Sequence, residues 1–280
     1  MTGTVRAALA AGAARLAAAG VPEAARDARR LMAAALGVAP DRLTLLAGDP
    51  LPAGADATFG RMIAERGRFR PVSQITGRRS FWGRDFAVTG AVLDPRPETE
   101  TLVALALAGR PAACILDLGV GSGAILLTLL AEWPNAQGTG VDIDPAALAL
   151  ARKNAQALGV AGRARFREAD WTDGIAERFD LVVANPPYVA EAELDALAPD
   201  VRDWEPRHAL TAGPSGLESY ARLAPAIPAV LAPGGRVLVE VGAGQGAAVA
   251  ARFAEAGFRR VEVHPDLDGR DRVVEAADPG

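Results

Sequence analysis

Residues 114–123 read Cys-Ile-Leu-Asp-Leu-Gly-Val-Gly-Ser-Gly, and this stretch decides the fold. Its apolar first half is typical of a buried strand in a parallel sheet. The glycines that follow let the backbone approach a ligand, and leucines at helical spacing run from Ala124 to Glu132 directly after them. A strand, a glycine-rich turn and a helix form a nucleotide-binding element. The third glycine comes one residue earlier than in a dinucleotide fingerprint, which argues against NAD.

Polar residues also follow two further predicted strands. Asp142 comes about 20 residues after the glycines, where an acidic side chain accepts hydrogen bonds from ribose hydroxyls. The apolar run 181–184 leads into Asn185–Tyr188, which reads Asn-Pro-Pro-Tyr. Two consecutive prolines have no N–H for a sheet ladder, so the chain must leave the sheet there. Because ligands bind at the carboxyl ends of strands in an open α/β sheet, we expect this rigid segment to hold a planar nitrogen group.

Apolar spacing divides the chain into three parts. Helical patterns at 5–19 and 23–36, with shorter ones at 41–47 and 54–70, predict a helical domain over residues 1–72. Two short strands between residues 75 and 92 predict a β-hairpin linker over 73–95. Strands then alternate with helices over 96–280, the pattern of a doubly wound α/β sheet. The expected strands are 113–118, 137–141, 164–168, 179–184, 235–241, 259–264 and 271–276.

Composition limits the classes of protein to which the chain can belong. Half of its 280 residues are hydrophobic, yet no apolar run reaches the roughly 18 residues of a membrane span. The single cysteine, Cys114, cannot form an internal disulfide, and its place in a predicted strand favours a buried structural thiol in a cytoplasmic protein. Residues 1–20 are rich in alanine and lack acids, like a transit peptide, but they contain almost no serine.

Charge is distributed unevenly along the chain. Residues 1–80 contain 12 Arg and 6 acidic residues, a net charge of +6, and the remaining 200 residues contain 18 basic and 28 acidic ones, a net charge of −10. The basic N-terminal part could dock an acidic partner surface. It could equally be a solvated helical face.

Further motifs carry a resemblance to a known family. The chain resembles the class I S-adenosylmethionine-dependent methyltransferases and, more narrowly, the protein-(glutamine-N5) methyltransferases of peptide-chain release factors. The Asn-Pro-Pro-Tyr segment alone is less specific, since DNA amino-methyltransferases share it. The matching segments, besides those above, are Pro71–Gly77, Phe81–Gly83, Pro95–Glu100, Asp170–Trp171, Glu205–Arg207, Ala212–Gly213, Gly216–Leu217 and Asp266–Val273.

The resemblance implies a seven-stranded Rossmann-like sheet with an antiparallel last strand, and S-adenosylmethionine as cofactor. Asp117 would hold the methionine amino group or brace the glycine loop, Asp142 would bind the ribose, and Trp171 would lie by the adenine. A structural reading of Trp171 as a core residue is the alternative. The residues implied in cofactor binding are Asp117, Gly119, Val120, Gly121, Ser122, Gly123, Asp142, Trp171 and Asn185.

The resemblance also implies how an amide nitrogen would be methylated. The Asn185 side-chain oxygen and the Pro186 carbonyl would each accept one N–H of the substrate amide, and Tyr188 would pack over its plane. No strong general base is needed, so neither His208 nor His264 is assigned a catalytic role. Catalysis is thus assigned to Asn185, Pro186 and Tyr188; the expected substrate-binding residues are Asn185, Pro186, Pro187, Tyr188, Arg96 and Glu98, and no metal ligand is assigned.

Parts of this assignment have a purely structural alternative. Proline followed by acids, as in 95–100, is ordinary chemistry for the start of a helix, which would leave Arg96 and Glu98 without a substrate role. Asp94 stands where family members often have an apolar residue, and this puts the local wall of the substrate pocket in doubt.

Three functional hypotheses follow. The first is a cytoplasmic, monomeric enzyme that methylates the Gly-Gly-Gln glutamine of class 1 peptide-chain release factors, without binding nucleic acid directly. The second is an amino-methyltransferase acting on a flipped adenine or cytosine in DNA or RNA; the acidic catalytic half argues against it. The third is a non-catalytic S-adenosylmethionine-binding module. Such modules tend to lose the glycines or the Asn-Pro-Pro segment, and this chain retains both.

Overall fold

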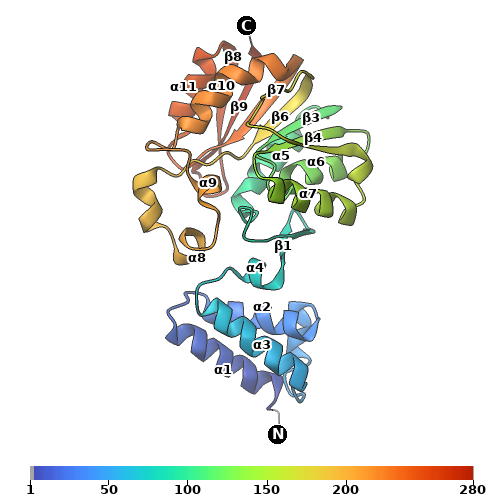
Figure 1. Ribbon diagram of the computed structural model, residues 1–280, viewed down its shortest axis with the longest axis vertical. Helices are drawn as coiled ribbons and strands as arrows, with labels where there is room; N and C mark the ends of the chain where they lie inside the picture. Colours follow the sequence, from blue (N-terminus) through green and yellow to red (C-terminus); the bar gives the residue numbers. More distant parts are fainter. Residues whose placement is uncertain (1–2, 280) are drawn as a thin grey trace. The chain divides into compact units, whose positions relative to one another are not determined.

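The computed structural model describes residues 3–279, which divide into two compact units. The first unit runs to Arg78 and also includes Ala198–Trp204, a short segment from much later in the chain. The second unit comprises Arg79–Leu197 and the residues from Glu205 onward. Figure 1 labels the elements of both.

The first unit is helical, as expected. Its elements are α1 (Val5–Ala18), α2 (Ala24–Leu36), η1 (Pro40–Thr44), α3 (Ala53–Arg66), α4 (Val72–Thr76) and α8 (Pro199–Arg202). The hydroxyl of Thr4 caps α1 by accepting a hydrogen bond from the Ala7 N–H, and α2 ends at Gly37 in the left-handed conformation, φ 65°. Its core side chains are Val5, Leu16, Val21, Leu31, Met32, Leu43, Leu51, Phe59 and Ile63.

Segment 198–204 is held within the first unit by polar contacts. Arg66 forms a buried ion pair with Asp27 at 2.7 Å, and its second terminal nitrogen lies 3.5 Å from Asp200. The carbonyl of Trp204 accepts a hydrogen bond from Gln74, and its indole N–H donates to the carbonyl of Arg68. The helical unit is therefore completed by residues that lie more than a hundred positions downstream.

A β-hairpin lies between the helical unit and the sheet in the sequence. Strands β1 (Arg78–Phe81) and β2 (Arg84–Ala87) turn at Trp82 and Gly83, which both have positive φ, as a type I′ turn requires. The hairpin was predicted, but its start was placed too early. The residues from 72 to 76 form α4 instead, because Gly77 ends that helix in the left-handed conformation.

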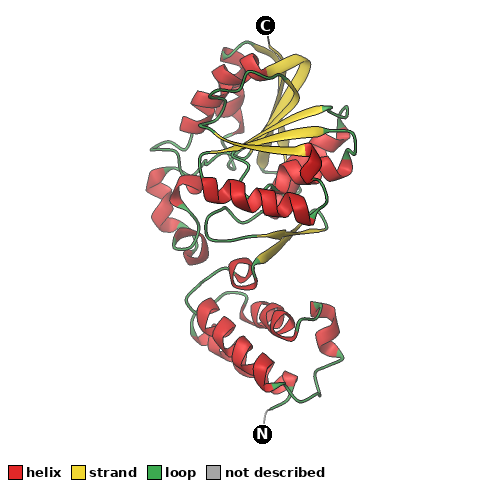
Figure 2. Cartoon of the chain, turned by 45° about the vertical axis from the view of Figure 1, so that its right-hand side comes forward, coloured by secondary structure: helices red, strands yellow, loops and turns green. Residues whose placement is uncertain are grey.

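The second unit is built on a seven-stranded sheet with the order β5-β4-β3-β6-β7-β9-β8. Its strands are β3 (Cys114–Leu118), β4 (Gln137–Asp142), β5 (Ala164–Glu168), β6 (Phe179–Ala184), β7 (Leu231–Glu240), β8 (Phe258–Pro265) and β9 (Asp271–Pro279). Only β9 runs antiparallel to its neighbours, β7 and β8. Helices cover both faces of the sheet (Figure 2), so the predicted doubly wound fold is confirmed.

Neighbouring residues along each strand enter different cores. Ile115 packs with α5 (Glu100–Ala108), α6 (Ala124–Glu132) and α7 (Pro145–Ala157), whereas Leu116 packs with α10 (Glu218–Val230) and α11 (Gly246–Glu255). This alternation buries the central strands on both faces and explains their continuous apolar sequences. The remaining short elements are η2 (Pro97–Thr99), η3 (Ala161–Arg163), η4 (Glu191–Ala196) and α9 (Arg207–Leu210).

Two expectations require correction. Cys114 is exposed, because it is the first residue of β3 and lies at the open end of the strand. The strand predicted to start at 235 begins at Leu231, which pairs with Phe179 ahead of a register shift. None of the helices within residues 3–279 is long and apolar enough to cross a membrane.

Candidate active site

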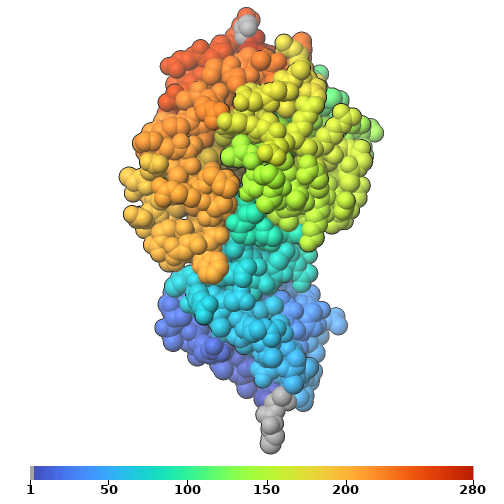
Figure 3. Space-filling model, viewed as in Figure 1, coloured from blue at the N-terminus to red at the C-terminus, as the bar shows by residue number. Residues whose placement is uncertain are grey.

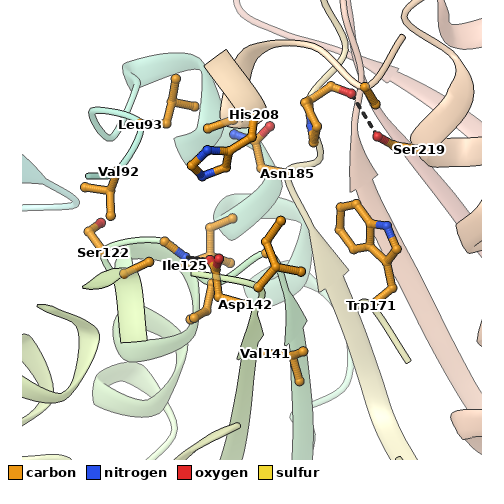
Figure 4. Close-up of a pocket in the computed structure, with 18 of the residues that line it drawn as sticks. Val92, Leu93, Ser122, Ile125, Val141, Asp142, Trp171, Asn185, His208 and Ser219 are labelled. Carbon is orange, nitrogen blue, oxygen red and sulfur yellow. Dashed lines mark hydrogen bonds between the residues drawn. The ribbon is translucent and has the colours of Figure 1, made fainter. Parts of the chain in front are cut away.

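A cavity of about 410 Å³ opens at the carboxyl ends of β3, β4 and β6, within the second unit. Figure 3 shows the orange and green parts of this unit facing each other across a hollow, and Figure 4 shows the side chains that line the cavity. Of the residues assigned from the sequence, those that line it are Arg96, Gly119, Val120, Gly121, Ser122, Asp142, Trp171, Asn185 and Pro187. Asp117, Gly123, Pro186, Tyr188 and Glu98 lie outside this lining.

The glycine loop is tied to the end of the neighbouring strand. Gly119 and Val120 both donate their backbone N–H to the Val141 carbonyl at 2.9 Å. Gly121 has φ 52°, and a Cβ there would meet no atom closer than 4.0 Å, so its face toward the cavity is open. Gly123 serves packing instead, because a Cβ there would lie 2.7 Å from the Leu127 side chain. The loop therefore presents bare backbone to a ligand.

Asp142 is fixed by backbone donors and faces the cavity (Figure 4). One carboxylate oxygen accepts the Gly121 N–H at 2.9 Å, and the other accepts the Asp144 N–H at 3.0 Å. Each oxygen keeps a further lone pair, since a carboxylate offers about four acceptor positions. A pair of ribose hydroxyls is the kind of ligand that this arrangement suits.

Asp117 is buried beneath the glycine loop. Its Oδ2 accepts the Leu126 N–H at 3.2 Å, in the first turn of α6, and its Oδ1 has no hydrogen-bond partner among residues 3–279. Burial raises the pKa of this carboxyl to about 7, against the opposing effect of the Leu126 hydrogen bond, and the charge of Asp142 raises it further. One oxygen thus accepts a hydrogen bond from α6, and the other has no partner among the described residues.

The cavity wall next to the glycine loop is aromatic and apolar. Trp171 has φ 56°, an uncommon conformation for a bulky residue, and its ring lies within 3.6 Å of where a Gly119 Cβ would be. Ile143 lines the same cavity although its side chain is 54% exposed. An exposed isoleucine and a tryptophan together provide surfaces for a flat aromatic ligand.

Asn185 follows β6, and its side-chain amide has a defined orientation. The NH2 group donates to the Thr99 hydroxyl at 3.2 Å. The amide oxygen is buried and has no hydrogen-bond partner among the described residues. A buried, unpaired acceptor costs free energy unless a ligand pairs with it. This atom is therefore the strongest single indication of a bound N–H donor.

Of the three backbone carbonyls directly after Asn185, two accept hydrogen bonds from side chains. The Ser219 hydroxyl donates to the Pro187 carbonyl at 3.1 Å (dashed in Figure 4), and the Gln245 amide donates to the Tyr188 carbonyl at 3.0 Å. Within residues 3–279, the Pro186 carbonyl accepts no such bond. The Asn185 amide oxygen and the Pro186 carbonyl are thus left free to accept hydrogen bonds from a ligand.

Tyr188 is partly buried against the core that contains α10. Burial raises the pKa of its phenol to about 12, and the charge of Glu240 adds to the rise. The phenol therefore stays protonated at neutral pH. Its ring can act as a packing surface, and its hydroxyl is a poor candidate for a base.

Arg96 and Glu98 have different surroundings. One Arg96 nitrogen contacts both carboxylate oxygens of Glu205 at 2.7 Å, and this pair joins two segments of the cavity wall. Burial raises the pKa of Glu205 to about 7, opposed by the Arg96 charge. Glu98 is exposed and outside the cavity lining.

Several lining residues have no local sequence signal. Thr99 comes from η2 whereas Ser219 and Arg222 come from α10, and Arg222 pairs with Asp170 at 2.7 Å. His208, which the sequence left without a catalytic role, points its ring into the cavity close to Asn185 (Figure 4). Only the fold brings these side chains to the glycine loop.

Comparison with known proteins finds a matching family profile in each unit. The profile "Methyltransferase small domain" matches residues 98–200, and the profile "PrmC N-terminal domain" matches residues 7–77. The release factor glutamine methyltransferase of Cereibacter sphaeroides is 56% identical over 265 residues, which cover 95% of this chain and 95% of that protein. The protein of the same name from Rhodospirillum rubrum is 45% identical, over 94% of this chain and 82% of its own length.

One solved structure has a similar fold. A methyltransferase from Pyrococcus furiosus superposes with a TM-score of 0.53 at 16% identity, over 71% of this chain and 90% of that one. At this identity the similarity concerns the architecture alone.

Proposed function

Because this chain belongs to the release factor glutamine methyltransferase family, we propose that it methylates the side-chain N5 of the glutamine in the Gly-Gly-Gln motif of class 1 peptide-chain release factors. The chain is an S-adenosylmethionine-dependent methyltransferase. Its proposed substrate acts in translation, so we place the enzyme in the cytoplasm.

The cavity suits S-adenosylmethionine, which supplies an electrophilic methyl group on a sulfonium. The open backbone at Gly121 would admit the methionine portion, and Asp142 would bind the ribose hydroxyls. Trp171 and Ile143 would flank the adenine. The unpaired Oδ1 of Asp117 lies near the loop as an acceptor for an ammonium group.

The observation that carries the proposed reaction is the unpaired amide oxygen of Asn185. A glutamine side chain has two N–H donors, and the segment offers two matching free acceptors, this oxygen and the Pro186 carbonyl. An ester or hydroxyl substrate would not satisfy both. The geometry therefore supports a primary amide or another planar amino group as the methyl acceptor.

Holding both hydrogens would make the amide nitrogen a better nucleophile. Its lone pair is normally delocalised into the carbonyl, and fixing the N–H bonds lets the nitrogen rehybridise toward the methyl carbon. The positive charge that develops on the nitrogen then faces two preorganised acceptors. The Tyr188 ring would limit motion of the amide plane, and the apolar cavity walls exclude water. The methylated amide loses its extra proton readily to solvent.

Mass spectrometry of a release factor after incubation with the enzyme and S-adenosylmethionine tests the proposal. We expect one added methyl on the Gly-Gly-Gln glutamine. Asn185→Ala should lower kcat by about a hundredfold or more, since it removes one of two transition-state acceptors. Its affinity for S-adenosylhomocysteine should stay within a few-fold.

Asn135→Ala is the matched control, because Asn135 is an exposed asparagine of the second unit outside the cavity. Near-normal turnover by Asn185→Ala would refute the mechanism. Methyl incorporation into DNA or RNA in place of the release factor would favour the nucleic-acid hypothesis.

A further inference from the structure

The orientation of the Asn185 amide has to be specified by its surroundings. A primary amide has nearly the same shape after a half-turn about its last bond, but its oxygen and its NH2 group exchange places. Only the orientation with the oxygen toward the cavity can accept a substrate N–H. In the reversed orientation, the Asn185 NH2 group would face the substrate N–H, and two donors cannot form a hydrogen bond with each other. Some group near Asn185 must therefore discriminate between the two.

Thr99 is the residue that contacts the amide. It is buried, and its hydroxyl accepts the Asn185 NH2 at 3.2 Å. Thr99 ends η2 with helical backbone angles, φ −64° and ψ −20°, and its side chain makes no capping hydrogen bond to α5. The hydroxyl is thus committed to Asn185. A hydroxyl has one hydrogen and two lone pairs, so its hydrogen still needs an acceptor.

Glu240 is the candidate for that acceptor. It ends β7, one residue beyond Val239, which pairs with Ala184 directly before Asn185. Its side chain is 1% exposed, and neither carboxylate oxygen has a hydrogen-bond partner of standard geometry among residues 3–279. The Thr99 hydroxyl nevertheless lowers the pKa of this carboxyl, against the larger effect of burial.

We propose that Thr99 and Glu240 are positioning residues that keep the Asn185 amide oxygen turned toward the methyl acceptor. An ionised carboxylate can only accept, so the Thr99 hydrogen points to Glu240. The Thr99 oxygen can then only accept from Asn185, which places the NH2 group there and the amide oxygen in the cavity. This inference rests on the proposed function of Asn185 and adds two residues outside its motif.

The protonation state of Glu240 decides whether Thr99 holds the Asn185 amide in this orientation. Burial raises the pKa of its carboxyl to about 7; the Thr99 hydroxyl and the charges of Arg272 and Arg96 lower it, and Glu98 raises it. Two tyrosines also lie nearby: Tyr188, whose own pKa the Glu240 charge raises, and Tyr220, whose hydroxyl donates to the Glu240 backbone carbonyl at 2.9 Å. A protonated Glu240 can donate to Thr99, which frees the Thr99 hydrogen for the Asn185 oxygen. The productive orientation is therefore favoured above this pKa and lost below it.

The test measures kcat for release-factor methylation at saturating S-adenosylmethionine between pH 6 and 9. Thr99→Val keeps the shape of the side chain and removes the hydroxyl, and we expect kcat to fall by about tenfold or more with little change in the KM for S-adenosylmethionine. Thr99→Ser restores the hydroxyl and should recover activity to within a few-fold of wild type. Glu240→Gln cannot ionise, and its amide both donates and accepts. It should lower kcat at pH 8.5 and remove the fall in kcat below pH 7.

Thr128→Val is the matched control, because Thr128 is a fully buried threonine in α6 that does not line the cavity. The inference is wrong if Thr99→Val and Thr128→Val have the same kcat, or if Glu240→Gln keeps the acidic fall of the wild type. A wild-type protein that does not methylate release factor refutes the proposed function alone. The orientation is then judged by NMR from hydrogen exchange of the Asn185 side-chain NH2, which Thr99→Val should accelerate. If Thr99→Val leaves the exchange rate of the Asn185 NH2 unchanged, the proposed positioning role of Thr99 is wrong.

Discussion

Three carboxyl groups in and around the cavity, Asp117, Glu205 and Glu240, each have a pKa that burial raises to about 7. Isolated aspartates and glutamates titrate near 4. Each group would bind a cation or a donor more strongly once ionised, so the charge of the site changes across neutral pH. Burial thus makes the site sensitive to pH within the range in which the enzyme has to act.

Cofactor affinity should depend on pH through Asp117. If its free oxygen binds the ammonium of the cofactor, affinity for S-adenosylhomocysteine should weaken as pH falls through about 7, because protonation neutralises the carboxylate. Asp117→Asn should bind about tenfold more weakly at pH 8 and lose most of the pH dependence. Calorimetry between pH 6 and 8.5 measures both. Glu240→Gln is the control and should retain the dependence; an unaltered dependence in Asp117→Asn would leave Asp117 a brace for α6 only.

Local motifs made part of the site predictable at this scale. Asn185 follows the apolar strand β6, and Asp142 ends β4 about 20 residues after the glycine loop, so their place at the sheet edge followed from the chain order. Thr99 and Glu240 are single polar residues whose proposed role depends on a neighbour far away in sequence, and no local sequence pattern indicates that role. The prediction that Cys114 is buried was wrong, because the apolar run does not show which of its ends is open to solvent.

Among the elements, the loop at 213–217 supports the segment that follows Asn185. A Cβ on Gly216 would lie 2.4 Å from the Tyr188 carbonyl and 3.0 Å from the Ala190 nitrogen, and Gly216 has φ 71°. The two loops can approach this closely only because glycine lacks a side chain. The position of Tyr188 is therefore set partly by an element almost thirty residues away in sequence.

Gly216→Ala should displace the segment that carries Pro186 and Tyr188. We expect kcat for release-factor methylation to fall by about tenfold or more, while affinity for S-adenosylhomocysteine changes little, because the glycine loop is untouched. Gly159→Ala has a similar backbone strain, φ 70°, with no atom within 4 Å of the new Cβ. Its kcat should equal that of the wild type. Equal kcat in the two variants would show that the contact with Tyr188 does not position the site.

Most elements could be predicted because the pattern of apolar residues in their sequence reflects which faces are buried. The central strands are buried on both faces and therefore have continuous apolar runs, which the sequence shows directly. Residues 72–76 were harder, since a single helical turn has too few residues for a period. The early start of β7 depends on a register shift against β6, which is a property of the pair.

For the whole molecule, the opposite charges of the N-terminal part and the remainder, +6 over residues 1–80 and −10 over residues 81–280, imply different partners for the two. Arg26 and Arg30 on α2 are both exposed, and Arg26 is only loosely paired with Glu23 at 3.5 Å. Exposed pairs of this kind contribute little to stability. These arginines are therefore free to contact an acidic protein surface.

Reversing both charges, as Arg26→Glu with Arg30→Glu, should raise the KM for intact release factor several-fold and reduce the salt dependence of kcat/KM. Turnover at saturating release factor should not change. Arg259→Glu with Arg260→Glu alters the net charge equally on exposed residues of β8, and it should leave the KM unchanged. If both double variants behave alike, the basic domain is a solvated surface and does not dock the substrate.

The return of residues 198–204 to the helical unit has an evolutionary consequence. A recombination event that joined residues 1–78 to a different enzyme would leave Asp200 and Trp204 behind, together with their contacts to Arg66, Arg68 and Gln74. The transferred piece would lack part of its own structure. Gene fusion at that boundary is therefore disfavoured, and the two units are expected to have been inherited together as one lineage.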